Sequence, residues 1–417
     1  MVAKRSEPST PAPEPPGLPE WAVYIYMKPD QALEEFAERD IREMAAGVTG
    51  AAFPVAVQMD QERDVQRLSI AAGHATRIDA STWKQAGTNR AIGASEGFAD
   101  FLRWAGTRYP AKRRFVVLWG HSRGVGIDLV GPAAEVVDVP DDAGGVFLRP
   151  SGAPPADGLS FEELFNLAAV FPTAAQGIAL QSGEPVSIDL LGLDSCYMSS
   201  AEFAHELTSR VGFLVAADGA VKRTGWNYRD VLGALSANPA MAPEALAATI
   251  VEHVARLDGD VSLARLDLEK SPALAQAFAA LVSALRDVIV DPDEAHALYI
   301  MLKRTSYFQV RQFLDLRDLC HRLRAGFDGA VREAADRVLA AYHDMVFSRA
   351  IGAALGRLNG VSIYCPLFRA QRPFGSDTPD VDAVVMEAEY ERLKFATGTG
   401  WFALCRQLQP RLAASRL

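Results

Sequence analysis

Short apolar runs of strand-like composition alternate with amphipathic helical stretches through the first half of this chain. The runs RRFVVLW (113–119) and VSIDLLGLD (186–194) are apolar on both faces, as expected for central strands of a parallel sheet that helices cover. Further runs of this kind cover 21–27, 53–59, 212–218 and 360–366. Residues 94–107 carry apolar side chains at helical spacing. The alternation predicts an α/β fold with a mostly parallel central sheet.

The same patterns divide the chain of 417 residues into segments. Residues 1–19 are rich in proline and too polar to bury much surface, which predicts a disordered tail. Residues 20–235 form the α/β core, interrupted by a long Pro-, Gly- and Asp-rich loop at 131–159. Residues 236–345 are mainly helical, and residues 346–417 add a strand and helices that complete the fold. Helices are expected at 31–46, 198–208, 242–256, 270–289, 311–324 and 328–345.

Charge and cysteine content limit the classes of partner and compartment. A net charge of −10 argues against nucleic acid and anionic membranes as partners, since both bind basic surfaces. The four cysteines are far apart and no C-x-x-C motif occurs, so neither a disulfide scaffold nor a zinc knuckle is expected. Reduced thiols and a proline-rich start without an apolar stretch predict a cytoplasmic protein.

The segment GHSRG (120–124) has two readings that lead to different enzymes. It matches G-x-S-x-G, the nucleophile elbow of serine hydrolases, with Ser122 as nucleophile. An elbow needs a helix directly after the serine, whereas VGIDLVGP follows here. In the second reading His121 ends a buried strand, where open parallel sheets collect catalytic groups, and serves as general base.

A cysteine follows the next strand end of the predicted core. Cys196 lies between strand 186–194 and helix 198–208, where a helix N-terminus lowers a thiol pKa and favours the nucleophilic thiolate. Neighbouring strand ends would bring Cys196 and His121 together as a dyad. The alternative is an inert buried thiol, which is what the other three cysteines indicate.

These segments carry a family resemblance. FLRWAGTRYPAKRRFVVLWGHSRG, followed by LLGLDSCYMSSAEFAHEL, resembles the clostripain family of cysteine peptidases, relatives of caspases and gingipains. FLVAADGAVKRTGWNYRDVLGAL and GVSIYCP resemble later parts of the same family. The resemblance implies a bacterial enzyme with a caspase-like α/β/α sandwich and a His121/Cys196 dyad. It also implies an oxyanion hole formed by the backbone N–H groups of Ser122 and Cys196. One departure is Ser122, where the family usually has glycine.

The resemblance extends to the reaction and its control. It implies hydrolysis of polypeptide substrates through an acyl-enzyme, with Asp194 and Asp218 binding Arg or Lys at P1, although Asp218 is equally explained as a turn residue before Gly219. Relatives are often zymogens cut between the dyad residues, by themselves or by an activating protease, and Arg149 is the candidate cleavage site there. Lys222 and Arg223, after Cys196, form a second basic site. The sequence identifies no cofactor, but some relatives need calcium, and the acidic segment DVPDD (138–142) could supply oxygen ligands to it, with solvated surface charge as the alternative.

Two other functions remain open at this level. One is a serine esterase that uses Ser122, and the other is a catalytically inactive caspase-like scaffold. A thiol-directed arginyl ketone and a fluorophosphonate would separate the three functions, because each reagent labels a different nucleophile. The role of residues 236–345, as packing scaffold or regulatory surface, also remains open.

Overall fold

The structure is a computed structural model of the full chain. It describes residues 17–29, 33–50, 53–61, 64–78, 94–120, 134–137, 147–150, 188–219, 221–222, 224–257, 261–307, 311–351, 358–367 and 390–414. Most of the predicted tail 1–19 therefore lies outside the described residues, as do His121, Ser122, Arg223 and the segment DVPDD.

A nine-stranded sheet in the order β13-β11-β10-β9-β5-β1-β2-β3-β4 forms the centre of the molecule. Its five middle strands, from β10 to β2, pair in parallel, and antiparallel strands extend the sheet at both edges. These strands are β1 (Trp21–Lys28), β2 (Val55–Gln61), β3 (Asp64–Ala71), β4 (His74–Ile78), β5 (Arg113–Gly120), β9 (Ile188–Asp194), β10 (Val211–Ala217), β11 (Ser262–Asp267) and β13 (Val346–Ile351).

Helices cover both faces of the sheet and bury a separate apolar cluster on each. One cluster includes Val23, Ile25 and Val117 of the sheet and packs against α1 (Glu34–Gly47), α6 (Tyr228–Ala237) and α7 (Pro243–Leu257). The other cluster packs against α3 (Ala94–Arg108) and α5 (Ala201–Glu206). Alternate residues of β1 enter opposite clusters, as the two-residue period of a strand requires. The predicted α/β fold is thus confirmed.

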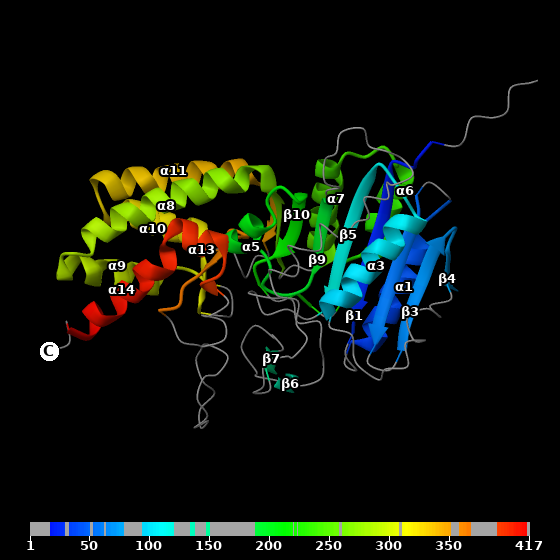
Figure 1. The fold of residues 1–417 in the computed structure, drawn as a ribbon, viewed down its shortest axis with the longest axis horizontal. Helices are drawn as coiled ribbons and strands as arrows, with labels where there is room; N and C mark the ends of the chain where they lie inside the picture. Colours follow the sequence, from blue (N-terminus) through cyan, green and yellow to red (C-terminus); the bar gives the residue numbers. More distant parts are fainter. Residues whose placement is uncertain are drawn as a thin grey trace, which may run out of the picture.

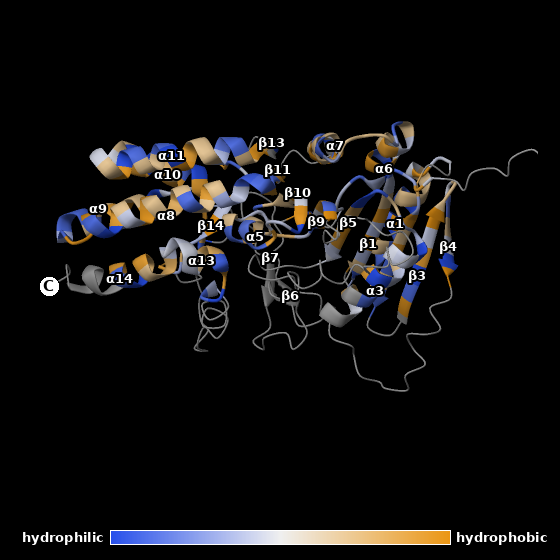
Figure 2. Cartoon of the chain, turned by 45° about the horizontal axis from the view of Figure 1, so that its top comes forward, coloured by the Kyte–Doolittle hydropathy of each residue, from blue (hydrophilic) through white to orange (hydrophobic). Residues whose placement is uncertain are grey.

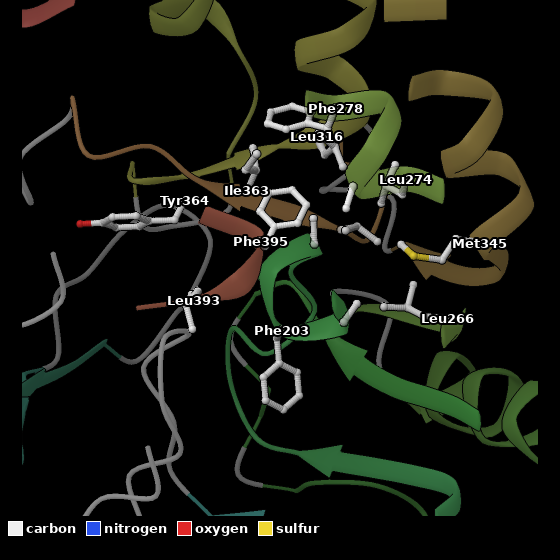
Figure 3. Packing of buried hydrophobic residues seen from close by; sticks show 14 of the residues in the cluster. Phe203, Leu266, Leu274, Phe278, Leu316, Met345, Ile363, Tyr364, Leu393 and Phe395 are labelled. Carbon is white, nitrogen blue, oxygen red and sulfur yellow. The ribbon is translucent and has the colours of Figure 1, made fainter. Parts of the chain in front are cut away.

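The C-terminal half adds helices that gather at one end of the molecule, away from β1–β4 (Figure 1). They are α8 (Ser271–Val288), α9 (Pro292–Arg304), α10 (Leu316–Gly326), α11 (Gly329–Met345), α13 (Lys394–Thr399) and α14 (Trp401–Ala414). Their apolar sides face one another and their polar sides face outward (Figure 2). Phe203 of α5, Phe278 of α8 and Phe395 of α13 belong to one apolar cluster, which therefore runs from the sheet into these helices (Figure 3).

Residues 236–345 were expected to be mainly helical, but they also contain strands. β11 pairs with β10, so the central sheet crosses the boundary predicted at residue 235. The helix expected at 311–324 begins only at Leu316, because Phe313–Asp315 forms strand β12, which pairs with β14 (Ser362–Tyr364). Asp315 then caps α10 by accepting the Asp318 N–H at 2.7 Å.

The predicted loop 131–159 contains a described two-stranded sheet. β6 (Ala134–Val137) pairs antiparallel with β7 (Phe147–Pro150), and Arg149 lies opposite Glu135. None of the helices within the described ranges is long and apolar enough to cross a bilayer.

Candidate active site

The carboxyl ends of β5 and β9 bring the two predicted catalytic segments to one edge of the sheet. The strands are parallel neighbours, and their last register pair is Trp119 opposite Asp194. In the sequence, His121 comes two residues after Trp119, and Cys196 comes two residues after Asp194. The register therefore starts both segments at the same level of the sheet.

Cys196 is partly exposed, unlike the other three cysteines, which are buried. Its Sγ accepts the backbone N–H of Val221 at 3.4 Å and lies 4.0 Å from the carbonyl oxygen of the same residue. Burial raises the pKa of the Cys196 thiol to about 11, and the negative charge of Asp194 acts in the same direction, while the Val221 N–H lowers it. A thiol in this environment is protonated at neutral pH.

The helix expected immediately after Cys196 is displaced and short. α5 begins at Ala201 and has six residues, with Ser200 as its N-cap accepting the Phe203 N–H at 3.2 Å. The prediction that this helix lowers the pKa of the thiol is wrong, because burial dominates and the helix begins five residues beyond the sulfur. An imidazole that removes the thiol proton is correspondingly more important for catalysis.

Asp194 is buried on the sheet face that α1, α6 and α7 cover. Its Oδ2 accepts the Trp226 N–H at 3.1 Å and the Tyr228 hydroxyl at 2.9 Å. Burial raises its pKa to about 6, so at neutral pH the carboxyl group is mostly ionised despite being 5% exposed. Gly225 approaches closely, since a Cβ on it would lie 2.7 Å from this Oδ2.

A second carboxyl group, Asp40 of α1, lies beside Asp194. It accepts the indole N–H of Trp119 at 3.0 Å and a hydrogen bond from Arg39 at 2.7 Å. Burial and, to a smaller extent, the neighbouring charge of Asp194 raise the pKa of Asp40 to about 8. Asp40 was not predicted as a site residue, because an acidic residue within AERDIREM is typical of a solvated helix face.

Asp218 lies on the opposite side of the sheet from Asp194. It follows Ala217 at the end of β10, where its backbone N–H donates to the Ser262 carbonyl at 3.2 Å. Burial raises its pKa to about 7, and the charge of Asp315 acts in the same direction. Its Oδ1 has no hydrogen-bond partner among the described residues. The structure therefore separates the two carboxylates that the sequence analysis grouped together.

The ranges that the structure describes contain no cluster of three or more His, Cys, Asp or Glu side chains arranged to hold a metal ion. The acidic segment DVPDD, which the sequence analysis considered for calcium, lies outside those ranges. The calcium hypothesis consequently has no described donor set.

Comparison with known proteins finds a family match over part of the chain. A sequence model of the clostripain family matches residues 173–356, which include Cys196, Asp194 and Asp218. The resemblance to the clostripain family is confirmed. The match supports the prediction of a clostripain-like cysteine peptidase, a class whose substrates are polypeptides. A search of curated proteins finds no significant match.

Solved structures share the fold at low sequence identity. A secreted C11 cysteine protease from Bacteroides thetaiotaomicron with an irreversible peptide inhibitor is 17% identical, with a TM-score of 0.60 over 92% of this chain and 99% of that one. An inactive zymogen C11 protease from Parabacteroides distasonis is 14% identical, with a TM-score of 0.61 over 93% and 99%. The B. thetaiotaomicron protease iotapain, also secreted, is 15% identical, with a TM-score of 0.62 over 92% and 100%.

The prediction of a cytoplasmic protein is wrong, because solved relatives of this fold are secreted proteases. The prediction depended on the proline-rich start of the chain and on its unpaired cysteines. The burial of three of these cysteines explains equally well why they are unpaired. Cys320, Cys365 and Cys405 are each at most 1% exposed, so burial protects these thiols whatever the redox state of the compartment.

Proposed function

We propose that this peptidase hydrolyses peptide bonds with Cys196 as nucleophile and His121 as general base and acid. The observation that carries the proposal is the β5–β9 register, which starts the histidine and cysteine segments from neighbouring parallel strands at one level. His121 removes the proton of the Cys196 thiol, and the thiolate attacks the scissile carbonyl carbon. The raised pKa of Cys196 makes this proton transfer necessary at neutral pH.

The rest of the reaction follows acyl-transfer chemistry. The backbone N–H groups of Ser122 and Cys196 stabilise the oxyanion, and His121 protonates the leaving amine as the C–N bond breaks. Water, deprotonated by His121, then attacks the thioester and releases the acid and the free thiol. The side chain of Ser122 takes no part in these steps.

Substitutions and active-site probes test the dyad. Cys196→Ala and His121→Ala should each abolish hydrolysis of an arginyl peptide, whereas Ser122→Ala should keep it. A thiol-directed arginyl ketone should label Cys196 in the intact protein. Labelling of Ser122 by a fluorophosphonate would instead favour the serine esterase, and a folded protein that reacts with neither reagent would favour the inactive scaffold.

Asp194 is our candidate for recognition of Arg or Lys at P1. Its charge reaches the thiol, since it contributes to the raised pKa of Cys196. Trp226 and Tyr228 hold Oδ2, which fixes the plane of the carboxyl group, and we assign Oδ1 to the substrate cation. Asp40 adds a second carboxyl group beside it, and a bound cation would relieve the repulsion between the two.

Asp218, the second predicted P1 residue, is the weaker candidate. It faces Ser262 and Asp315 on the other side of the sheet from Asp194. We therefore assign it to the packing of β10 against the C-terminal half. Matched Asn substitutions at positions 194 and 218 separate these roles.

Activation by cleavage remains a proposal with two candidate bonds, one between the dyad residues after Arg149 and one beyond Cys196 after Lys222. Arg149 lies in the β6–β7 ladder, so cutting there requires that the pair separate. Lys222 follows Val221, whose backbone N–H contacts the Cys196 sulfur. The peptide bond after Lys222 is therefore near this sulfur before any cleavage. Mass spectrometry of the incubated chain distinguishes fragments that end at residue 149 or 222. Cys196→Ala should stay whole if the chain cuts itself, and only an added protease should then cleave it.

The secreted relatives also lead us to propose that the chain acts outside the cytoplasm. Fractionation of the producing bacterium tests this, with antibody against the protein expected to detect it in the medium or envelope fraction. Detection only in the cytosol would contradict the proposal.

A further inference from the structure

Tyr197, the residue directly after the nucleophile, has a backbone conformation that bulky residues rarely adopt. Its φ is +57°, in the left-handed region. Two other non-glycine residues within the described ranges have positive φ: Ala72, in the turn between β3 and β4, and Ser209, in the turn between α5 and β10. Those two lie at ordinary chain reversals, whereas Tyr197 lies at the active site.

Contacts from two directions hold this conformation. The Tyr197 N–H donates to the Gly219 carbonyl at 2.9 Å, which ties the turn to the end of β10. The Tyr197 ring stacks on Phe313 of β12, with centroids 6.2 Å apart and planes 16° from parallel. A left-handed conformation at a bulky residue persists only where its surroundings determine it, and these two contacts do so.

Phe313 is itself fixed by the C-terminal half. It is 3% exposed, pairs with Tyr364 across the β12–β14 ladder, and packs against the Tyr364 ring at 5.7 Å. The Tyr364 N–H in turn donates to the carboxylate of Glu202 at 2.8 Å, on the helix that follows the nucleophile. The stack thus connects the turn that carries Cys196 to elements more than 100 residues later in the chain.

We propose that Tyr197 is a positioning residue whose stack on Phe313 holds the Cys196 turn in its strained, catalytically competent shape. The C-terminal half thereby sets the direction of the nucleophile. Without the stack, residue 197 is no longer held in the left-handed region, the peptide between Cys196 and residue 197 is free to rotate, and Sγ leaves its contact with the Val221 N–H. This inference rests on the proposed role of Cys196 as nucleophile.

The test uses four single variants of the full chain and one double variant. Tyr197→Gly permits the backbone conformation but removes the ring, and Phe313→Leu keeps apolar volume but removes the stack. Tyr197→Phe keeps both ring and stack. Ala72→Gly is the matched control, since it relieves the same kind of strain in a turn outside the site. The double variant combines Tyr197→Gly with Phe313→Leu.

Turnover is measured per active site, titrated with an arginyl ketone. Tyr197→Gly and Phe313→Leu should each lower kcat about tenfold or more, with KM within about twofold, because small misplacements of a nucleophile are costly. The double variant should be no more than about twofold slower than the slower single variant, as expected for two halves of one contact. Tyr197→Phe should stay within about threefold of the original chain, and Ala72→Gly should match it.

Alkylation of Cys196 by iodoacetamide at pH 8 gives a second measurement that needs no hydrolysis. Tyr197→Gly should be alkylated about threefold faster or more, because the released thiol becomes less buried and more of it ionises. If Tyr197→Gly does not fold, the same comparison is made with Phe313→Leu. Unchanged kcat and unchanged alkylation in the folded variant, or multiplicative losses in the double variant, would overturn the inference. A chain that is alkylated but does not hydrolyse peptides would instead overturn the proposed function, and the alkylation comparison would still decide the role of Tyr197.

Discussion

Two buried aspartates lie at the ends of neighbouring parallel strands in this protein, yet their surroundings differ. Asp194, the last residue of β9, accepts two hydrogen bonds on one oxygen and lies beside a second carboxyl group at the end of the sheet near Cys196. Asp218, after β10, packs against Ser262 and Asp315 and leaves one oxygen without a partner among the described residues. The surroundings of a carboxylate at a strand end therefore depend on the sheet face on which it lies. The position of the residue in a sequence motif does not reveal that face.

The largest effect should distinguish the two aspartates in catalysis. Asp194→Asn removes the charge that we assign to the P1 cation, so kcat/KM for an arginyl peptide should fall about 100-fold or more, equivalent to about 2.7 kcal/mol. Asp218→Asn should change kcat/KM less than about fivefold. Steady-state kinetics with matched Arg and norleucine peptides measures both values. Equal losses in the two variants would show that both carboxylates bind the substrate.

A methyl group at position 225 should disturb the surroundings of Asp194 and leave those of Asp218 unchanged. In Gly225→Ala the new Cβ would meet Oδ2 at 2.7 Å, and the residue has φ +53°. We expect a loss of about 2 kcal/mol in the free energy of unfolding, measured by urea denaturation. Gly50→Ala is the control, because Gly50 also has positive φ (+98°) but nothing within 4 Å of its Cβ position. If both variants lose the same free energy of unfolding, backbone strain alone explains the effect of Gly225→Ala.

The pH dependence of stability tests the environment of Asp218. Burial raises the pKa of Asp218 to about 7 in the folded state, so the folded protein binds a proton that the unfolded chain releases near pH 4. The free energy of unfolding should therefore fall as the pH rises from about 4 to 7, by at most about 1.4 kcal/mol per unit from this group. Asp218→Asn should remove that share of the slope. An unchanged slope in urea titrations would mean that Asp218 gains a partner in solution.

The smallest effect should come from the hydroxyl group that holds Asp194. Tyr228→Phe removes one hydrogen bond to Oδ2 and should cost about 1 kcal/mol of stability, with a modest rise in KM for arginyl peptides. Tyr24→Phe is the control, since its hydroxyl donates to the Tyr109 carbonyl at 2.6 Å. It should lower stability by a similar amount and leave KM unchanged. If KM rises equally in both variants, the Tyr228 hydroxyl group has no specific role in substrate binding.

Much of the sheet could be predicted because buried parallel strands and amphipathic helices leave strong periodic signals. β1, β2, β5, β9 and β10 lie within about two residues of the predicted runs, as do α3, α7, α8 and α11. The outer antiparallel strands β3, β4, β11 and β13 were not predicted. β3 and β4 carry mixed sequences, DVQRLSIA and HATRI, without a clear apolar run. The strand β12 was predicted as part of a helix, because three residues are too few to show a strand period.

The candidate site was predictable in its nucleophile and less so in its surroundings. A thiol after a buried strand is visible in the sequence, and the family match supports its role. The raised pKa of that thiol was not visible, because it depends on the burial of the thiol and on the charge of Asp194, which together outweigh the hydrogen bond from the Val221 N–H. Asp40 and Phe313 were equally hidden, since each reaches the site from a distant part of the chain.

Local pattern along the chain was enough to locate the five parallel strands and the longer helices, and with them the edge of the sheet where Cys196 emerges. Periodicity alone decides this, because apolar faces must be buried wherever they occur. The packing of distant elements decided which face each aspartate enters, how strongly burial shifts their pKa values, and which ring supports Tyr197. Those properties depend on the distances between atoms that folding brings together, and separation along the chain does not encode such distances.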